Sequence, residues 1–314
     1  MDKLLPNGVI LPKIGAQSFE YGGMTPVGTD IIIPDGNAIP FLPVFETQAN
    51  TYFDTWGCVG HSHDNALQTD AKARYGIDVD FSDRDIVVLS GTVPRVGNSG
   101  EAVLESVQIN GVIPQELGDW DSRNRDSKVN IEEVYYSYKR SEEGVKAAKI
   151  HKDNYEIIGE WVHRSNWQEA SKRGVLQLYV QAWYINSKGE YYSPTGKFNH
   201  AVIMADYRTR KIFDSYEPRI KTLDSWDSIY PWALKINLIK KNMAKPIIKN
   251  NTLVQAIYKG EGGGQFGLYL DDKILIGDLA ELLATFYMRN NGETVGKTMP
   301  LNKEQWDMFT KRPI

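Results

Sequence analysis

Between residues 58 and 239, the sequence pattern changes from helical spacing to short apolar strands. Within residues 58–74, side chains are spaced as on one face of a helix and no proline intervenes, which predicts a helix there. A second, shorter helix is expected over 102–110, ended by Gly111. Between 175 and 239, short apolar runs rich in β-branched and aromatic residues predict strands joined by tight turns. Helices followed by an antiparallel sheet are typical of an α+β fold.

The expected strands cover residues 175–180, 182–185, 200–205, 211–214 and 233–239. A further buried strand is expected at 30–33, inside a stretch that glycine and proline otherwise punctuate. Residues 132–173 have a mixed but mostly helical pattern, and the charge run at 139–152 indicates a solvated helix face.

Changes in composition divide the chain into three parts. Residues 1–40 read as an N-terminal extension, 41–241 as the main domain, and 252–314 as a small α+β module after a basic, polar linker. In that module we expect strands at 253–258 and 267–270 around a Gly-rich hairpin turn, and an amphipathic helix over 278–289. The turn lacks the Gly-Lys-Ser/Thr ending of a phosphate-binding loop.

Charge and cysteine usage exclude some partners and indicate a compartment. The 314 residues include 36 basic and 40 acidic side chains, a net charge of −4 that offers no strong basic field to a nucleic acid. No segment approaches the roughly 18 apolar residues needed to span a bilayer, and the N-terminus does not read as a signal peptide. The single cysteine cannot form an internal disulfide, so we expect a soluble protein in the reducing cytoplasm.

Cys58 stands where a loop becomes the long helix, in the segment Trp56-Gly57-Cys58-Val59-Gly60. The first amides of a helix are unpaired, and their field favours a thiolate at this position. A lone cysteine can also be a small buried hydrophobe. Because Cys58 stands at the helix start, a reactive thiol and a buried hydrophobe are equally supported at this point.

A thiolate nucleophile needs a base that can return the proton to the leaving group, and histidine suits that role. His61 and His63 share the helix of Cys58 and are expected to point away from its sulfur, whereas His151 and His163 read as surface residues. His200 differs because it opens an apolar strand, where a ring is held rigidly. It is the candidate base.

Asp214 is the candidate group to orient that histidine. It ends the next strand, and two antiparallel strands joined by a tight turn bring their open ends together. Counted from the turn near 208–210, His200 and Asp214 do not match in register, so a stagger or bulge is needed. Asp214 could otherwise be an ordinary residue at a strand end.

The order of these residues resembles the papain-like cysteine peptidases. His200 and Asp214 follow Cys58 by 142 and 156 residues, against roughly 130–150 in that family. The segment Asn199-His200-Ala201-Val202 is similar to the family's histidine motif, and Phe213-Asp214-Ser215-Tyr216 lies where papains carry Asn-Ser-Trp. Two further segments look like family elements: 81–85 like a stretch that closes a helix, and 97–100 like the Gly-rich lining of the substrate cleft. The resemblance covers about residues 40–240.

The resemblance implies a papain-like fold, with a helical half that carries the cysteine and a sheet half that carries the histidine and the aspartate. It also implies an oxyanion hole made by the Cys58 backbone N–H and Gln48, which lies ten residues upstream where papains have about six. The implied substrate-binding residues are Asn98, Ser99, Gly100 and Asn199.

The chain departs from the papain pattern in three ways. The disulfides are absent, no long inhibitory segment is recognisable before the domain, and the third residue is Asp rather than Asn. Transglutaminases and arylamine acetyltransferases share the fold and use Cys-His-Asp. No cofactor is expected. A metal site made of Cys58, His61, His63 and Asp64 is the weaker alternative, because the two histidines face different sides of the helix.

Three functions therefore stay open. The first is a thiol peptidase that hydrolyses peptide or isopeptide bonds of a peptide or protein substrate. The second is an inactive papain-like structural or binding protein in a larger assembly, such as a phage particle. The third is a transglutaminase or acyltransferase with a Cys-His-Asp triad.

Overall fold

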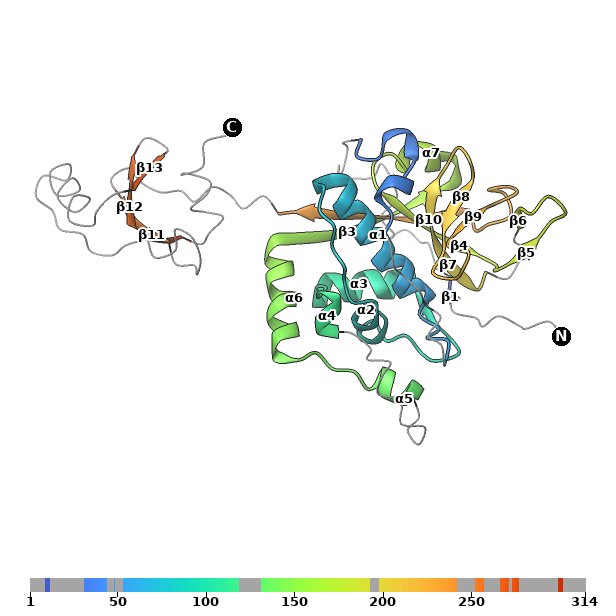
Figure 1. Ribbon diagram of the computed structural model, residues 1–314, viewed down its shortest axis with the longest axis horizontal. Coiled ribbons are helices and arrows are strands. Elements are labelled where there is room, and N and C mark those ends of the chain that lie inside the picture. The colour runs from blue at the N-terminus through green and yellow to red at the C-terminus, as the bar shows by residue number, and fades with distance from the viewer. Residues whose placement is uncertain are drawn as a thin grey trace, which may run out of the picture. The chain divides into compact units, whose positions relative to one another are not determined.

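The structure is a computed structural model (Figure 1). It describes residues 9–11, 31–43, 48, 53–118, 131–192 and 198–241, and the backbone of four strands between 252 and 301. Within these residues, every helix is too short or too polar to cross a bilayer.

The chain forms two compact units, Met1–Lys241 and Asn242–Ile314. The second unit contains a four-stranded sheet in the order β13-β12-β11-β14, in which only the β11–β14 pair is parallel. Its strands are β11 (Thr252–Ala256), β12 (Phe266–Leu270), β13 (Lys273–Ile276) and β14 (Met299–Leu301). The first two correspond to the expected strands, and the sequence patterns did not indicate the other two. The expected turn at 260–264 and helix at 278–289 lie outside the described residues, and the three-part division of the chain stays a prediction.

The first unit begins with a helical part and continues into a sheet, which is the predicted α+β arrangement (Figure 1). Two short strands, β1 (Val9–Ile10) and β2 (Asn98–Ser99), pair in parallel beside the helices. The α-helices are α1 (Cys58–Tyr75), α2 (Asp83–Leu89), α3 (Gly100–Asn110), α4 (Gln115–Gly118), α5 (Ile131–Tyr136), α6 (Glu142–Asn154) and α7 (Trp167–Ala170). Three 3₁₀ turns, η1 (Pro34–Gly36), η2 (Ile39–Phe41) and η3 (Arg164–Asn166), complete the helical elements of the described residues.

The main sheet of the described residues has six strands in the order β3-β10-β4-β7-β8-β9, and every neighbouring pair is antiparallel. A separate small ribbon consists of β5 (Tyr184–Ile185) and β6 (Tyr191–Tyr192). The strands of the main sheet are β3 (Tyr155–His163), β4 (Val175–Val180), β7 (His200–Asp206), β8 (Lys211–Phe213), β9 (Ile220–Thr222) and β10 (Trp232–Lys240).

Helix α1 is buried along most of its length, which explains why its sequence is not simply amphipathic. Several of its buried polar side chains are hydrogen-bonded to the sheet. Asp70 accepts hydrogen bonds from the Arg74 side chain, the Asn237 amide and the Leu238 backbone N–H. Gln177 of β4 donates to the Val59 carbonyl and the Ser62 hydroxyl near the other end of the helix. These bonds fix α1 against the sheet at both ends.

Two stretches of this unit show how the structure departs from the sequence-based expectations. Residues 31–33 form no strand, because Ile33 turns into the core while Ile31 stays exposed and the chain continues into η1. The stretch 132–173 is mostly helical, as expected, but it also contains the nine-residue strand β3, which the sequence pattern did not indicate. Helix α6 ends directly at Tyr155, where the chain joins β10 along its whole length. Tertiary pairing outweighs local propensity there.

Gly60 allows α1 and α2 to approach closely. A Cβ atom at Gly60 would lie 2.6 Å from the Val87 Cγ2 atom and 3.3 Å from the Val87 Cα atom, too close without a backbone shift. Gly60→Ala is therefore expected to lower the free energy of unfolding by about 1–3 kcal/mol, as overpacking does. Urea denaturation measures this. In Gly144→Ala, the matched control within α6, the nearest atoms lie at an ordinary 3.5 Å, so stability should be unchanged or slightly raised. Equal effects of the two substitutions would contradict the packing argument.

Candidate active site

Cys58 is the first residue of α1 and lines a pocket of about 230 Å³. The preceding turn aims it there. Trp56 has a left-handed backbone (φ 54°), and its N–H donates to the Asp54 carboxylate at 2.8 Å. Gly57 is the N-cap residue and provides no side-chain cap. Cys58 therefore stands in the first turn of α1, at the positive end of the helix dipole.

His200 and Asp214 come together because β7 and β8 are antiparallel neighbours. His200 is the first residue of β7, and Asp214 directly follows β8. The register of the pair shifts between Met204 and Asp206, which supplies the bulge that the residue count required. As a result the His200 Nε2 atom lies 2.7 Å from the Asp214 Oδ1 atom, and both side chains are buried.

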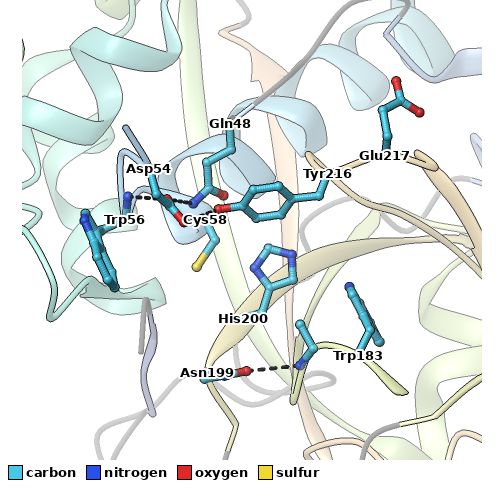
Figure 2. A pocket seen from close by; sticks show the side chains of 10 residues that line it. Gln48, Asp54, Trp56, Cys58, Trp183, Asn199, His200, Tyr216 and Glu217 are labelled. Atoms are coloured by element: carbon cyan, nitrogen blue, oxygen red, sulfur yellow. Dashed lines mark hydrogen bonds between the residues drawn. The ribbon is translucent and has the colours of Figure 1, made fainter. Parts of the chain in front are cut away.

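The sulfur of Cys58 points toward the other side of the His200 ring (Figure 2). Burial alone would lower the pKa of His200, but the charge and hydrogen bond of Asp214 and a hydrogen bond with Cys58 raise that pKa to about 10. His200 therefore carries its proton at neutral pH, between the Asp214 carboxylate and the Cys58 sulfur.

Asp214 has hydrogen-bond donors at both carboxylate oxygens. Oδ1 also accepts from the Tyr216 backbone N–H at 3.0 Å, and Oδ2 accepts from the Trp183 indole N–H at 2.7 Å. The Lys221 ammonium lies 2.9 Å from Oδ2. Burial opposes ionisation of Asp214, but the charges and hydrogen bonds of His200 and Lys221 lower its pKa to about 2. The carboxylate is thus ionised and fixed in orientation.

Gln48 lies in the same pocket as Cys58, despite the longer spacing between them. Its side chain is held from both ends: Nε2 donates to the Asp54 Oδ1 atom at 3.0 Å, and Oε1 accepts from the Ser215 hydroxyl at 3.1 Å. The Tyr216 hydroxyl donates to the other oxygen of Asp54 at 2.6 Å (Figure 2). Gln48 is thus held in one orientation on the wall of the pocket that also contains Cys58.

The other expected substrate-binding residues are divided between two places. Asn199 lines the pocket, and its Oδ1 atom accepts from the Ala182 backbone N–H at 3.0 Å. The Asn98 side chain donates to Ser90 and Thr92 instead, and the Ser99 hydroxyl caps α3. The backbone of Asn98 and Ser99 already pairs with β1. At Gly100 a Cβ atom would lie 2.0 Å from the Tyr179 hydroxyl, so this position is closely packed.

The remaining histidines lie outside the pocket. The ring of His61 contacts Asp83 (Nδ1–Oδ2 3.0 Å), so it does not join Cys58 in the metal site considered from the sequence. Burial lowers the pKa of His63 to about 3, so its ring is neutral. His151, expected at the surface, instead packs between Phe81 and Tyr155, and its pKa is lowered to about 4 by burial. The described residues contain no group of three or more potential metal ligands.

Several pocket residues carried no sequence signal of their own. Asp54 stands two residues before a tryptophan in a loop, and Trp183 was assigned to a strand, although it precedes β5. Lys221, which contacts Asp214 but does not line the pocket, was not singled out from the sequence either. The residues that line the pocket are Gln48, Asp54, Trp56, Cys58, Ala182, Trp183, Asn199, His200, Tyr216 and Glu217.

Comparison with known proteins finds similarity only among solved structures. No family model and no curated protein sequence matches the chain. Xylellain, a cysteine protease from Xylella fastidiosa, is 16% identical with a TM-score of 0.48, over 76% of this chain and 97% of that one. The Carica candamarcensis cysteine protease CMS1MS2, solved with E-64, is 12% identical with a TM-score of 0.46, over 63% and 94%. Procathepsin L2 from Tenebrio molitor is also 12% identical with a TM-score of 0.46, over 74% and 78%.

Xylellain and CMS1MS2 are cysteine proteases, and procathepsin L2 is a proteinase. At 12–16% identity these similarities carry no activity to this chain. The comparisons give no support to a phage origin.

Proposed function

We propose that this chain is a thiol hydrolase that cuts peptide or isopeptide bonds through a thioester intermediate. The observation that carries the proposal is the continuous chain of contacts from Cys58 through His200 to Asp214, on the wall of a pocket. These are the nucleophile, the base and the orienting group of thiol-dependent acyl transfer. Gln48 supports the same proposal, because its amide lies where an oxyanion needs a donor.

The proposed reaction has two steps. The Cys58 thiolate attacks the carbonyl carbon of the substrate, and the oxyanion is stabilised by Gln48 and the Cys58 backbone N–H. His200 then gives its proton to the leaving nitrogen as the C–N bond breaks, which leaves a thioester. A water molecule attacks the thioester while His200 takes up its proton, and the C–S bond breaks to release the carboxylic acid and the thiolate. Asp214 holds the imidazole ring through both steps.

The test is selective labelling of Cys58. Native protein treated with E-64 or iodoacetamide at neutral pH should gain one adduct, located at Cys58 by peptide mass spectrometry. Cys58→Ser, the matched control, should gain none. Cys58 is 1% exposed, so a cysteine that merely fills space would react only after unfolding. If wild-type protein gains an adduct only in denaturant, the proposal is wrong.

A second candidate function is acyl transfer to an amine. It is favoured by Asp214, a carboxylate at the position where papains have the amide of an asparagine. The two functions differ in the second step, where an amine rather than water attacks the thioester. Incubating the protein with a glutamine-containing peptide and a fluorescent primary amine distinguishes them. Incorporation of the amine in excess over hydrolysis would favour the transferase.

The inactive scaffold protein is the third candidate. The 1% exposure of Cys58 favours it. The hydrogen bond between the His200 ring and Cys58, at the edge of the pocket, favours an enzyme instead. A peptide or protein substrate, a cytoplasmic location and membership of a larger assembly remain proposals. A substrate strand paired along Asn98 and Ser99 would have to replace β1 or use the other side of β2.

A further inference from the structure

Lys221 is a buried cation in direct contact with the candidate site. Its side chain is 2% exposed and belongs to β9, the edge strand beside β8. The ammonium group makes three close polar contacts: 2.9 Å to the Asp214 Oδ2 atom, and 2.7 Å each to the carbonyl oxygens of Tyr216 and Pro218. A lysine ammonium has three protons to donate, so all of them are used.

The surroundings of Lys221 are arranged to hold a charge. The ammonium lies 5.9 Å from the ring centroid of Trp183 and 5.6 Å from that of Tyr191, within the range of cation–π attraction. Burial lowers the pKa of Lys221, and the carboxylate of Asp214 opposes that shift. Burying a lysine ammonium costs free energy unless the charge is paired, and the Asp214 carboxylate of the candidate site provides that partner.

The two oxygens of Asp214 face two different cations. His200 binds Oδ1, and Lys221 binds Oδ2 together with the Trp183 indole N–H. Without Lys221, the full charge of Asp214 would act on His200 alone and hold the imidazole proton more tightly. A histidine that holds its proton too tightly is a poor general acid toward a leaving amine.

We propose that Lys221 is a positioning and charge-balancing residue that offsets the Asp214 carboxylate, so that His200 can release its proton during acyl transfer. This inference rests on the proposed function and extends it to a residue outside the Cys-His-Asp set. The site then contains two anions and two cations in alternation. The charged and titratable groups around Lys221 are Asp214, His200, Glu217, Tyr191 and Tyr216, and Cys58 lies beyond His200.

The proposal predicts that the effect of removing the lysine charge changes sign with the charge of residue 214. Lys221→Gln keeps a hydrogen-bond donor but removes the charge. In the wild-type background it should lower kcat/KM about tenfold, because His200 retains its proton. In the Asp214→Asn background, Lys221 is an unbalanced cation that disfavours the imidazolium. There Lys221→Gln should raise kcat/KM about three- to tenfold.

A purely structural role gives a different result. Lys221 also ties the 216–218 turn to β9, and loss of that tie would lower activity in both backgrounds. Lys221→Met, which removes the donor as well, measures this contribution separately. Losses of similar size in both backgrounds on Lys221→Gln would overturn the proposal, as would an unchanged kcat/KM in the wild-type background.

The rate of Cys58 alkylation by iodoacetamide at pH 7 provides a readout that needs no substrate. Lys221→Gln alone should leave this rate within about twofold, because the imidazolium is retained. Asp214→Asn should slow it, and adding Lys221→Gln should restore it at least in part. If wild-type protein is alkylated at Cys58 but hydrolyses no peptide, the proposed function fails while this cycle still tests Lys221. If hydrolysis is found, but Lys221→Gln neither changes the sign of its effect on kcat/KM nor speeds alkylation in the Asp214→Asn background, only the role of Lys221 fails.

Discussion

His200→Ala is expected to lower kcat/KM for peptide amide hydrolysis by at least about a thousandfold. The substitution removes the group that protonates the leaving nitrogen, and general acid–base groups contribute roughly 10²–10⁴. It also removes the imidazolium beside the sulfur, so alkylation of Cys58 by iodoacetamide at neutral pH should slow together with turnover. Both losses have one cause, the contact of His200 with Cys58 and Asp214.

The matched control is His163→Ala. His163 is exposed at the end of β3, and its ring contacts Ser165 and Trp232 rather than the pocket. Its removal should leave kcat/KM within about twofold. If the His200 variant kept more than a tenth of wild-type activity, or if both variants lost activity equally, His200 would not be the base.

The pH dependence of turnover should follow the charge of His200. The pKa of His200 is raised to about 10, so the imidazolium persists across neutral pH and is lost only as the pH rises through about 10. Activity that needs this proton should therefore fall on the alkaline side near that pH.

Arg140→Ala is expected to be the most destabilising of the substitutions considered, by about 3–5 kcal/mol in the free energy of unfolding. The Arg140 guanidinium binds both oxygens of Asp85, at 2.8 and 2.5 Å. It also donates to the carbonyls of Asn110 and Gly111. Asp85 is 1% exposed, so removal of its partner leaves an uncompensated buried charge, which costs far more than the pair contributes.

Arg208→Ala is the control for this substitution. Arg208 also contacts a carboxylate, that of Asp35 at 2.8 Å, but both side chains are mostly exposed and water screens the pair. Its loss should cost less than about 1 kcal/mol. Urea denaturation followed by tryptophan fluorescence measures both variants in the first unit, because seven of the eight tryptophans precede residue 242. Similar values for the two variants would contradict the burial argument.

The α+β architecture could be predicted from local pattern, because the spacing of apolar residues that distinguishes helices from strands is visible within a few neighbouring residues. The strands around His200 and Asp214 were predictable from apolar runs, and so was the start of α1 at Cys58. Even the need for a bulge between β7 and β8 followed from counting residues to the turn. By contrast, β3 was missed because it pairs with β10, whose residues lie 69 to 85 positions further along the chain, and no local pattern reports such a contact.

The amino-acid sequence by itself determined the order of helix and sheet and the residue types available for thiol chemistry. Only the tertiary structure decided which side chains surround them, and β9 illustrates why. Strand alternation and hydrophobicity would turn Ile220 inward and Lys221 outward, yet Ile220 is 38% exposed and Lys221 is buried. The carboxylate of Asp214 and two backbone carbonyls provide the partners that make a buried ammonium tolerable, and they are brought there by the folded chain.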